Sequence, residues 1–202
     1  MKLPITFIGL PVTILAGILA ITILLIDKKA ERHKKEIITL QTGLQSLKKA
    51  ETRTALSKIE VTSSWIMRHS SQISEAAAKQ IAEEVFKVPN PILMISLIEV
   101  ESLFIQSAVS KAGAVGLGQI MFEVHKKALA EIGISKKRDL FNIDCNIKAS
   151  SFILQGMIKR SNGDLTKALH LYLGGKDGRY VARIFSNYIH LSMEIENALP
   201  KM

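Results

Sequence analysis

Cysteine is nearly absent from this sequence: Cys145 is the only one in 202 residues. An internal disulfide is therefore excluded, and so is a zinc site built on paired cysteines or on a cysteine–histidine spacing. We interpret the lone thiol as a small buried hydrophobic side chain. The sequence predicts neither a metal nor another cofactor, because no metal-ligand spacing connects the histidines on the expected helices, His125, His170 and His190.

Aromatic residues are also scarce, at 5% of the chain, although the net charge is +9. A basic protein can bind nucleic acid, but such proteins usually interleave aromatic side chains with a basic patch or carry a recognisable motif. Neither feature is present, so the sequence predicts no nucleic-acid partner. Much of the positive charge instead follows one apolar stretch, at Lys28, Lys29, Arg32, Lys34 and Lys35. Such a cluster favours anionic lipid headgroups.

That apolar stretch, "ITFIGLPVTILAGILAITILLI" over residues 5–26, contains no charge. A helix rises about 1.5 Å per residue, so a run of this length crosses a hydrocarbon core of roughly 30 Å. A cleaved signal peptide is the alternative, but its apolar region normally has about 7–15 residues followed by small residues. Here the run continues into "DKKAERHKK". The sequence therefore predicts an uncleaved transmembrane anchor within residues 1–26.

Residues 27–73 are expected to form a polar helical stalk. Spacings of three, four and three separate its main apolar positions, which are Ile37, Leu40, Leu44 and Leu47. This pattern is that of a coiled-coil seam, but it lasts for only about two heptads. Two interpretations stay open: a short self-association helix, or an amphipathic spacer that packs on its own domain or on a partner.

Residues 74–202 show no convincing alternating strand pattern, so the sequence predicts an all-α domain, large enough for one core. Capping signals place helix starts at Ser74, Asn90 with Pro91, Asp144 and Asp164. A further helix is expected from near Gly116 to Gly133, and the last from near Arg179.

The stretch "LIEVESLFIQSAVSKAGAVGLGQIM", Leu97–Met121, holds the sharpest candidate for chemistry. Glu101 follows an almost wholly apolar helix, and desolvation raises the pKa of a carboxyl, as a general acid near neutral pH requires. Glu99 lies about 200° away around the helix and is expected to point to solvent. The alternative is a frayed helix end with two ordinary acidic residues.

The loop after Glu101 is rich in glycine, with Gly113, Gly116 and Gly118. Glycine permits tight turns and close approach of a ligand to the backbone. Gln119 comes next and offers both a donor and an acceptor to a sugar or an amide. Taken alone, such a loop indicates a turn more often than a site.

Together these residues resemble the signature of the lytic transglycosylases of the soluble-type (SLT) group, in the lysozyme superfamily. The family pattern is an apolar helix ending in Glu-Ser, an aromatic residue, and then "avS-x-x-GA-x-GLMQ". It is matched at Glu101, Ser102, Phe104, Ala108, Val109, Ser110, Gly113, Ala114, Gly116, Leu117 and Gln119. Later segments agree in order through Asn146, Ile147, Tyr172, Gly175, Tyr180 and Val181, so the resemblance covers about residues 76–190.

The resemblance implies a lysozyme-like helical fold and a single catalytic acid. Glu101 would protonate the bond between N-acetylmuramic acid and N-acetylglucosamine, then act as base on the muramoyl 6-hydroxyl, giving a 1,6-anhydro product. Tyr172 would hydrogen-bond or orient Glu101, and Gln119 would line the sugar groove. Ser102 is grouped with the substrate-binding residues, with a local cap as its alternative role. A hydrolysing muramidase is the second possible outcome.

Four positions depart from the family pattern. Leu103 replaces a Gly, Gly118 a Met, Phe122 a Pro, and Leu173 the Asn of the tyrosine motif. Gly118 and Leu173 motivate a second hypothesis: a catalytically degenerate lysozyme-like domain that serves as a structural or wall-binding part of a membrane complex.

The predicted partners are a peptidoglycan strand, the membrane, and machine subunits or a second copy through the stalk. The enzyme would open the wall locally for a secretion or conjugation machine, or for virus entry. The basic residues after the anchor favour a cytoplasmic domain under the positive-inside rule, but long domains translocate against that bias. We therefore expect a single-pass protein of the bacterial inner membrane whose domain faces the periplasm, or of a virion membrane.

Overall fold

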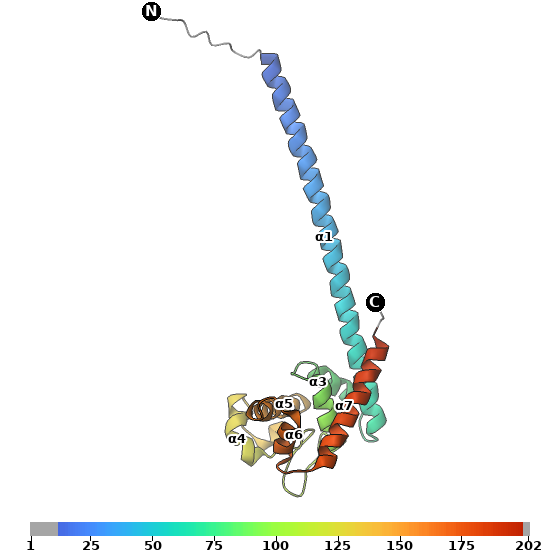
Figure 1. Cartoon of the computed structure of the whole chain (residues 1–202), viewed down its shortest axis with the longest axis vertical. Helices are drawn as coiled ribbons and strands as arrows, with labels where there is room; N and C mark the ends of the chain where they lie inside the picture. Colours follow the sequence, from blue (N-terminus) through green and yellow to red (C-terminus); the bar gives the residue numbers. More distant parts are fainter. Residues whose placement is uncertain (1–11, 200–202) are drawn as a thin grey trace, which may run out of the picture. The chain divides into compact units, whose positions relative to one another are not determined.

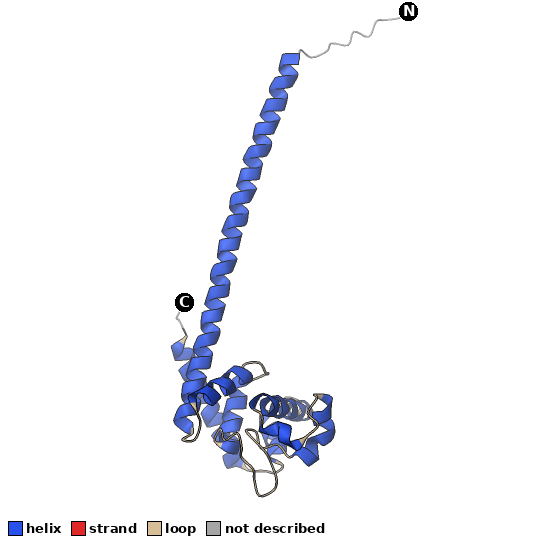
Figure 2. Cartoon of the chain, turned by 180° about the vertical axis from the view of Figure 1, so that it is seen from behind, coloured by secondary structure: helices blue, strands red, loops and turns tan. Residues whose placement is uncertain are grey.

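The structure, a computed structural model, describes residues 12–199 of the chain. Helices account for most of this part, and it contains no strand, only isolated β-bridges (Figures 1 and 2). The all-α prediction is confirmed. The helices in chain order are α1 (Val12–His69), α2 (Glu75–Val85), α3 (Pro91–Ser102), α4 (Phe122–Glu131), the 3-10 helix η1 (Lys137–Phe141), α5 (Ile143–Arg160), α6 (Leu165–Leu173) and α7 (Gly178–Ala198).

The predicted anchor, residues 5–26, starts outside the described part of the chain, which begins at residue 12. Within residues 12–199, no helix combines the length and the apolar character that crossing a membrane requires. Membrane anchoring therefore stays a prediction from the sequence.

The chain divides into two units at residues 52 and 53. In the first unit, the described residues belong to α1, and the apolar positions of its heptad pattern, such as Leu40 and Leu47, are exposed. The second unit begins earlier than the domain start predicted at Ser74. Trp65 and Ile66, which the sequence assigned to the stalk, lie in the hydrophobic core of this second unit.

The core of the second unit surrounds α3, which contacts α2, α5 and α7. Apolar side chains cover nearly every side of this helix, and most of them are buried, including Leu97 and Ile98 near its end. A helix that is hydrophobic all round is stable only when other elements enclose it. The chain thus brings the end of α3, with Glu101, to a fixed position inside the domain.

Several predicted helix starts are confirmed. Ser74 caps α2, because its hydroxyl accepts a hydrogen bond from the Ala77 N–H. Asp164 caps α6 in the same way, through the Lys167 N–H. Pro91 is the first residue of α3, although the Asn90 side chain makes no capping bond.

Two other predicted starts are wrong. The helix expected near Gly116 begins at Phe122, since residues 113–120 form a loop whose backbone is bonded within itself and to α5. The cap of α5 is Asn142, and Asp144 lies inside the first turn. There a carboxylate still interacts favourably with the helix dipole.

The predicted solvent-facing position of Glu99 is also wrong. Glu99 is 7% exposed, and its Oε2 accepts a hydrogen bond of 2.7 Å from Nε1 of Trp65. The last turn of α1 carries Trp65 against this side of α3, a contact that the local sequence around Glu99 does not indicate. A buried carboxylate needs such a donor, since an unpaired one loses its hydration without compensation. Glu99 therefore has a structural role in joining α1 to α3.

Candidate active site

Glu101 lies in the last turn of α3 and is partly buried. Tyr180, in the first turn of α7, donates its hydroxyl proton to Oε1 of Glu101 over 2.5 Å. The close packing of α3 on α7 brings the two residues together across 79 positions of sequence. Asp177 fixes the start of α7 by accepting from the Arg179 and Tyr180 N–H groups, so the tyrosine has a defined place.

The surroundings of Glu101 raise its pKa. Burial is the main cause, because it disfavours the charged form, while the hydrogen bond from Tyr180 acts in the opposite direction and is the smaller effect. The pKa of the Tyr180 hydroxyl is also raised, first by burial and then by the neighbouring Glu101 charge. Tyr180 therefore stays protonated and remains a donor. Together these groups give a carboxyl that holds its proton to a higher pH than a free glutamic acid does, which is the direction that a general acid needs.

The chain turns sharply just after the carboxylate. Leu103 and Phe104 both adopt left-handed backbone angles, with φ of 52° and 61°. Ser102 is buried, and its hydroxyl donates to the Ile98 carbonyl over 3.2 Å. This bond runs back one turn within α3, so it is a local contact of the hydroxyl and not a cap, because the C-cap of α3 is Leu103. Substrate binding by Ser102 stays a prediction from the sequence.

Asn146 of α5 holds the glycine-rich loop beside the site. It is 1% exposed, and its Nδ2 donates to the carbonyls of Val115 and Leu140 at 3.1 and 2.7 Å. Its Oδ1 accepts from the Gly118 N–H at 2.8 Å. The Val115 carbonyl also accepts from the Ile120 N–H, so the side chain of Asn146 is the partner of two buried backbone groups, the Leu140 carbonyl and the Gly118 N–H, and a second donor to the third.

The structure explains why glycine stands at position 118. A Cβ at this position would overlap the Ser150 hydroxyl and would lie 2.8 Å from the Ser150 Cβ and 3.0 Å from the Tyr172 hydroxyl. Ser150 and Tyr172 thus occupy the space that a larger residue would need. The Met of the family pattern would need different neighbours at this place. The glycine at position 118 therefore fits the side chains that surround it in this protein.

Tyr172 and Gln119 both contact this loop. The Tyr172 hydroxyl donates to the Gly118 carbonyl over 2.8 Å, whereas the bond predicted between Tyr172 and Glu101 is made by Tyr180. Burial raises the pKa of Tyr172, and the charge of nearby Glu101 raises it further. Gln119, half-buried with φ of 50°, donates from Nε2 to the carbonyls of Gly116 and Ala108.

Sequence reasoning missed the role of Tyr180. The signal was present, because Tyr180 and Val181 had been matched to the closing motif of the family, but spacing alone could not choose between two tyrosines. Within the described residues, no cluster of three or more His, Cys, Asp or Glu side chains could hold a metal ion. The chemistry that the site offers is thus proton transfer by Glu101, with Tyr180 as its hydrogen-bond donor.

One comparison with known proteins agrees with this geometry, and another found nothing: no curated protein sequence matches the chain. The family model of the transglycosylase SLT domain matches residues 64–182, more than half of the chain, and the matched region contains Glu101, the glycine-rich loop, Asn146, Tyr172 and Tyr180. Its start at residue 64 includes the last turns of α1, in keeping with the place of Trp65 in the core. The chain belongs to the transglycosylase SLT domain family.

Proposed function

We propose that this protein is a peptidoglycan lytic transglycosylase with Glu101 as its only catalytic acid and base. The observation that carries the proposal is the Glu101–Tyr180 pair at the end of a buried helix, inside a domain of the transglycosylase SLT family. Burial that raises the pKa of Glu101 supports the role of proton donor.

In the first step, protonated Glu101 gives its proton to the oxygen between N-acetylmuramic acid and N-acetylglucosamine. The bond from that oxygen to the muramoyl anomeric carbon breaks, and the leaving sugar keeps the proton as a hydroxyl. In the second step, the Glu101 carboxylate takes the proton of the muramoyl 6-hydroxyl. The oxygen of that hydroxyl attacks the anomeric carbon at the same time. The ring closes to the 1,6-anhydro sugar, and Glu101 is protonated again. One carboxyl thus serves both steps, unlike the usual pair in glycosidases.

Product analysis tests this reaction. Purified full-length protein should release muropeptides that end in 1,6-anhydromuramic acid from isolated peptidoglycan sacculi. Mass spectrometry separates these products from those of a hydrolase, because an anhydro end is lighter by one water than a reducing end. Reducing ends as the main product would show that the protein is a hydrolysing muramidase, and no release at all would favour the non-catalytic wall-binding alternative.

Tyr180→Phe is expected to change the pH dependence of cleavage. The Tyr180 hydroxyl stabilises the ionised carboxylate, so its loss raises the pKa of Glu101 further. A general acid acts while protonated, and activity falls as pH rises through its pKa. The alkaline limb of the kcat/KM profile should therefore move upward by about one pH unit, and kcat should fall about tenfold because the carboxyl loses its orientation.

Tyr188→Phe is the matched control for this measurement, because Tyr188 lies on the same helix and is 40% exposed. It should leave the profile unchanged. An alkaline limb that moves downward in Tyr180→Phe, or an equal shift in both variants, would contradict the role of Tyr180.

The proposal extends to the place of action. The uncharged run over residues 5–26 would anchor the enzyme, and residues 27–52 would act as a spacer that limits cutting to the wall near the membrane. The exposed apolar positions on that part of α1 offer a surface for self-association or for subunits of a secretion, conjugation or virus-entry machine. Protease digestion of intact cells tests the topology: an accessible domain supports the outside placement, whereas full protection without a later delivery step would contradict it.

A further inference from the structure

One stripe of apolar side chains on α1 is open to solvent. Its four members recur at intervals of three and four residues and are between 54% and 67% exposed: Ile37, Leu40, Leu44 and Leu47. In a heptad written a to g they take the positions a, d, a and d, and we call them the seam. All four belong to the first unit, which ends at residue 52. Other described residues leave the seam uncovered.

The seam is narrow. The e and g positions beside it hold polar or small residues, which are Lys34, Glu36, Gln41, Gly43, Lys48 and Ala50. Between residues 36 and 50, Ile38 is the only large apolar residue off the seam. On the opposite face, the hydroxyls of Thr39 and Thr42 donate to carbonyls one turn earlier in the same helix. A stripe of a and d positions alone fits one partner helix, whereas packing on a globular surface needs a broader apolar face.

The seam ends close to the start of the second unit. The next a and d positions toward the C-terminus are Glu51 and Thr54, which are polar. Further along α1, Ile66 is buried in the core of the second unit. The apolar residues of α1 therefore serve two purposes: those after residue 52 build the domain, and those of the seam do not.

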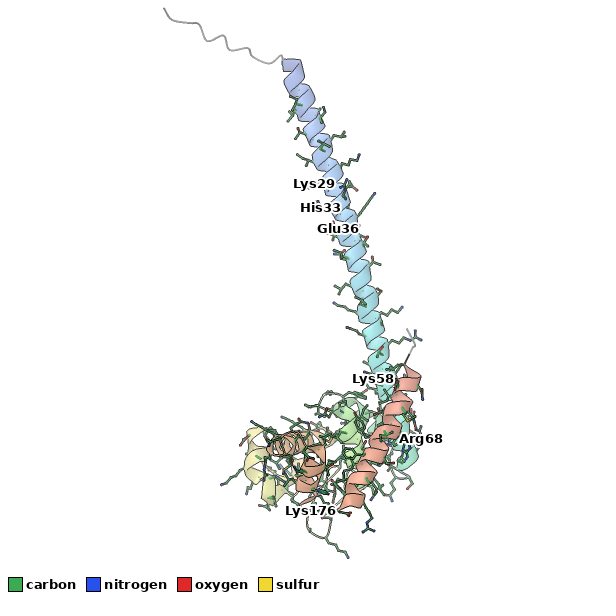
Figure 3. All side chains as sticks on the ribbon, in the orientation of Figure 1. Lys29, His33, Glu36, Lys58, Arg68 and Lys176 are labelled. Carbon is green, nitrogen blue, oxygen red and sulfur yellow. The ribbon has the colours of Figure 1, made fainter. Side chains whose placement is uncertain are left out.

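Charged residues limit the seam on the other side. The preceding d position is His33, whose Nδ1 lies 3.7 Å from Oε2 of Glu36 in the same helix (Figure 3). In a parallel helix pair, Lys29 of one helix faces Lys34 of the other, and like charges at such positions oppose pairing. The seam thus spans two heptads of the stalk.

The residue types in the seam favour a parallel pair of helices. Isoleucine at a together with leucine at d is typical of two-stranded parallel coiled coils. Ile37 occupies an a position, and Leu40 and Leu47 occupy the d positions. The remaining a position is Leu44.

The charges beside the seam are compatible with two identical helices. In a parallel pair in register, a g residue of one helix faces the e residue of the next heptad in the other. Glu36 then faces Gln41, and Gly43 faces Lys48. No like charges meet along the two heptads, so a second copy of the chain is an acceptable partner for the whole seam.

We propose that two copies of this chain pair through the seam as a parallel two-stranded coiled coil. The parallel direction rests on the proposed function, because anchors at residues 5–26 give both stalks the same orientation in one membrane. Two heptads are short for a stable interface, which buries roughly 1,200 Å² or more. Copies held in one membrane meet at a high effective concentration, which compensates for the small area. The pair carries two catalytic domains.

The test is disulfide cross-linking of the full chain in phosphatidylcholine vesicles, with Cys145→Ser removing the native thiol. Leu40→Cys places a thiol at a d position, where the two copies face each other, and a disulfide needs Cα atoms about 4.4–6.8 Å apart. We expect this variant to dimerise under mild oxidation at least about tenfold faster than Thr42→Cys. Thr42→Cys is the matched control, because it lies two residues away on the outer face of α1.

A second set of variants changes the seam around the thiol. Leu44→Gln/Leu47→Gln, added to Leu40→Cys, should slow cross-linking about tenfold, because apolar a and d residues hold such a pair together. Ile38→Gln, added to Leu40→Cys, should leave the rate unchanged, since Ile38 lies off the seam. Glutamine and leucine have similar helix propensities, and circular dichroism checks that the helix content is kept.

Three results would overturn the proposal. Equal rates for Leu40→Cys and Thr42→Cys would indicate random collisions in the membrane. Absence of any Leu40→Cys dimer would show that the seam binds another chain or none. Cross-linking of Leu40→Cys copies to Leu44→Cys copies, but not to each other, would indicate antiparallel helices.

Flotation and product analysis of the same samples separate this proposal from the proposed function. Protein that does not float with the vesicles would overturn the anchor, and the parallel pair with it. Release of anhydro products from sacculi needs Glu101 and not the seam, so loss of catalysis leaves cross-linking unchanged. Pairing and catalysis can therefore fail independently.

Discussion

Glu101→Gln is expected to lower peptidoglycan cleavage by about a thousandfold or more while leaving the fold intact. Glutamine keeps the size of the side chain and the oxygen that accepts from Tyr180, but it cannot deliver a proton to the glycosidic oxygen. Since one carboxyl serves both steps of the proposed reaction, the variant loses both at once. Release of soluble muropeptides from sacculi measures the loss, and the unfolding temperature should stay within a few degrees of the wild type.

Glu99→Gln is the matched control, because it makes the same chemical change two residues away. The amide oxygen of the substituted side chain can still accept from Trp65 Nε1, so the helix pair should hold. Cleavage should remain within about threefold of the wild type. Equal loss in both variants would show that the effect is structural, and equal activity of Glu101→Gln and wild type would remove Glu101 from the mechanism.

Much of the site could be predicted from the sequence because it depends on residues that are close together along the chain. The apolar run before Glu101 predicted a buried helix that ends at a carboxyl, and burial around Glu101 follows from that run. Helix caps at Ser74 and Asp164 also depend on neighbouring residues alone. Such features need no knowledge of which segments meet.

The parts that failed depend on contacts between distant segments. Glu99 was expected in solvent because nothing in its neighbourhood indicates that Trp65, 34 residues earlier, covers it. The tyrosine partner of Glu101 lies 79 residues away, and a motif match could not choose Tyr180 over Tyr172. Gly118 could be understood only when Ser150 was seen to fill the adjoining space. Packing between distant segments determines all three contacts, and the periodicity of the sequence gives no information about which distant segments meet.

Asn146→Ala should be the most destabilising single change near the site. It removes the side-chain partner of the Leu140 carbonyl and of the Gly118 N–H, both held by a side chain that is 1% exposed, while the Val115 carbonyl keeps its bond from the Ile120 N–H. We expect a loss of about 2–5 kcal/mol in the free energy of unfolding, because each of the two buried groups left without a partner costs about 1–3 kcal/mol. For a domain of this size, the unfolding temperature should fall by about 10 °C.

The single tryptophan makes this measurement specific. Trp65 is 4% exposed in the core of the second unit, so its fluorescence in a urea titration follows that unit and not residues 12–52 of α1. Asn197→Ala is the control, since Asn197 is exposed on α7 and should change stability by less than about 0.5 kcal/mol. If Asn146→Ala behaved like this control, the loop that carries Gly118 and Gln119 would be held by its own backbone bonds. Asn146 would then have no part in shaping the floor beside Glu101, and the three hydrogen bonds would be a consequence of the fold and not one of its causes.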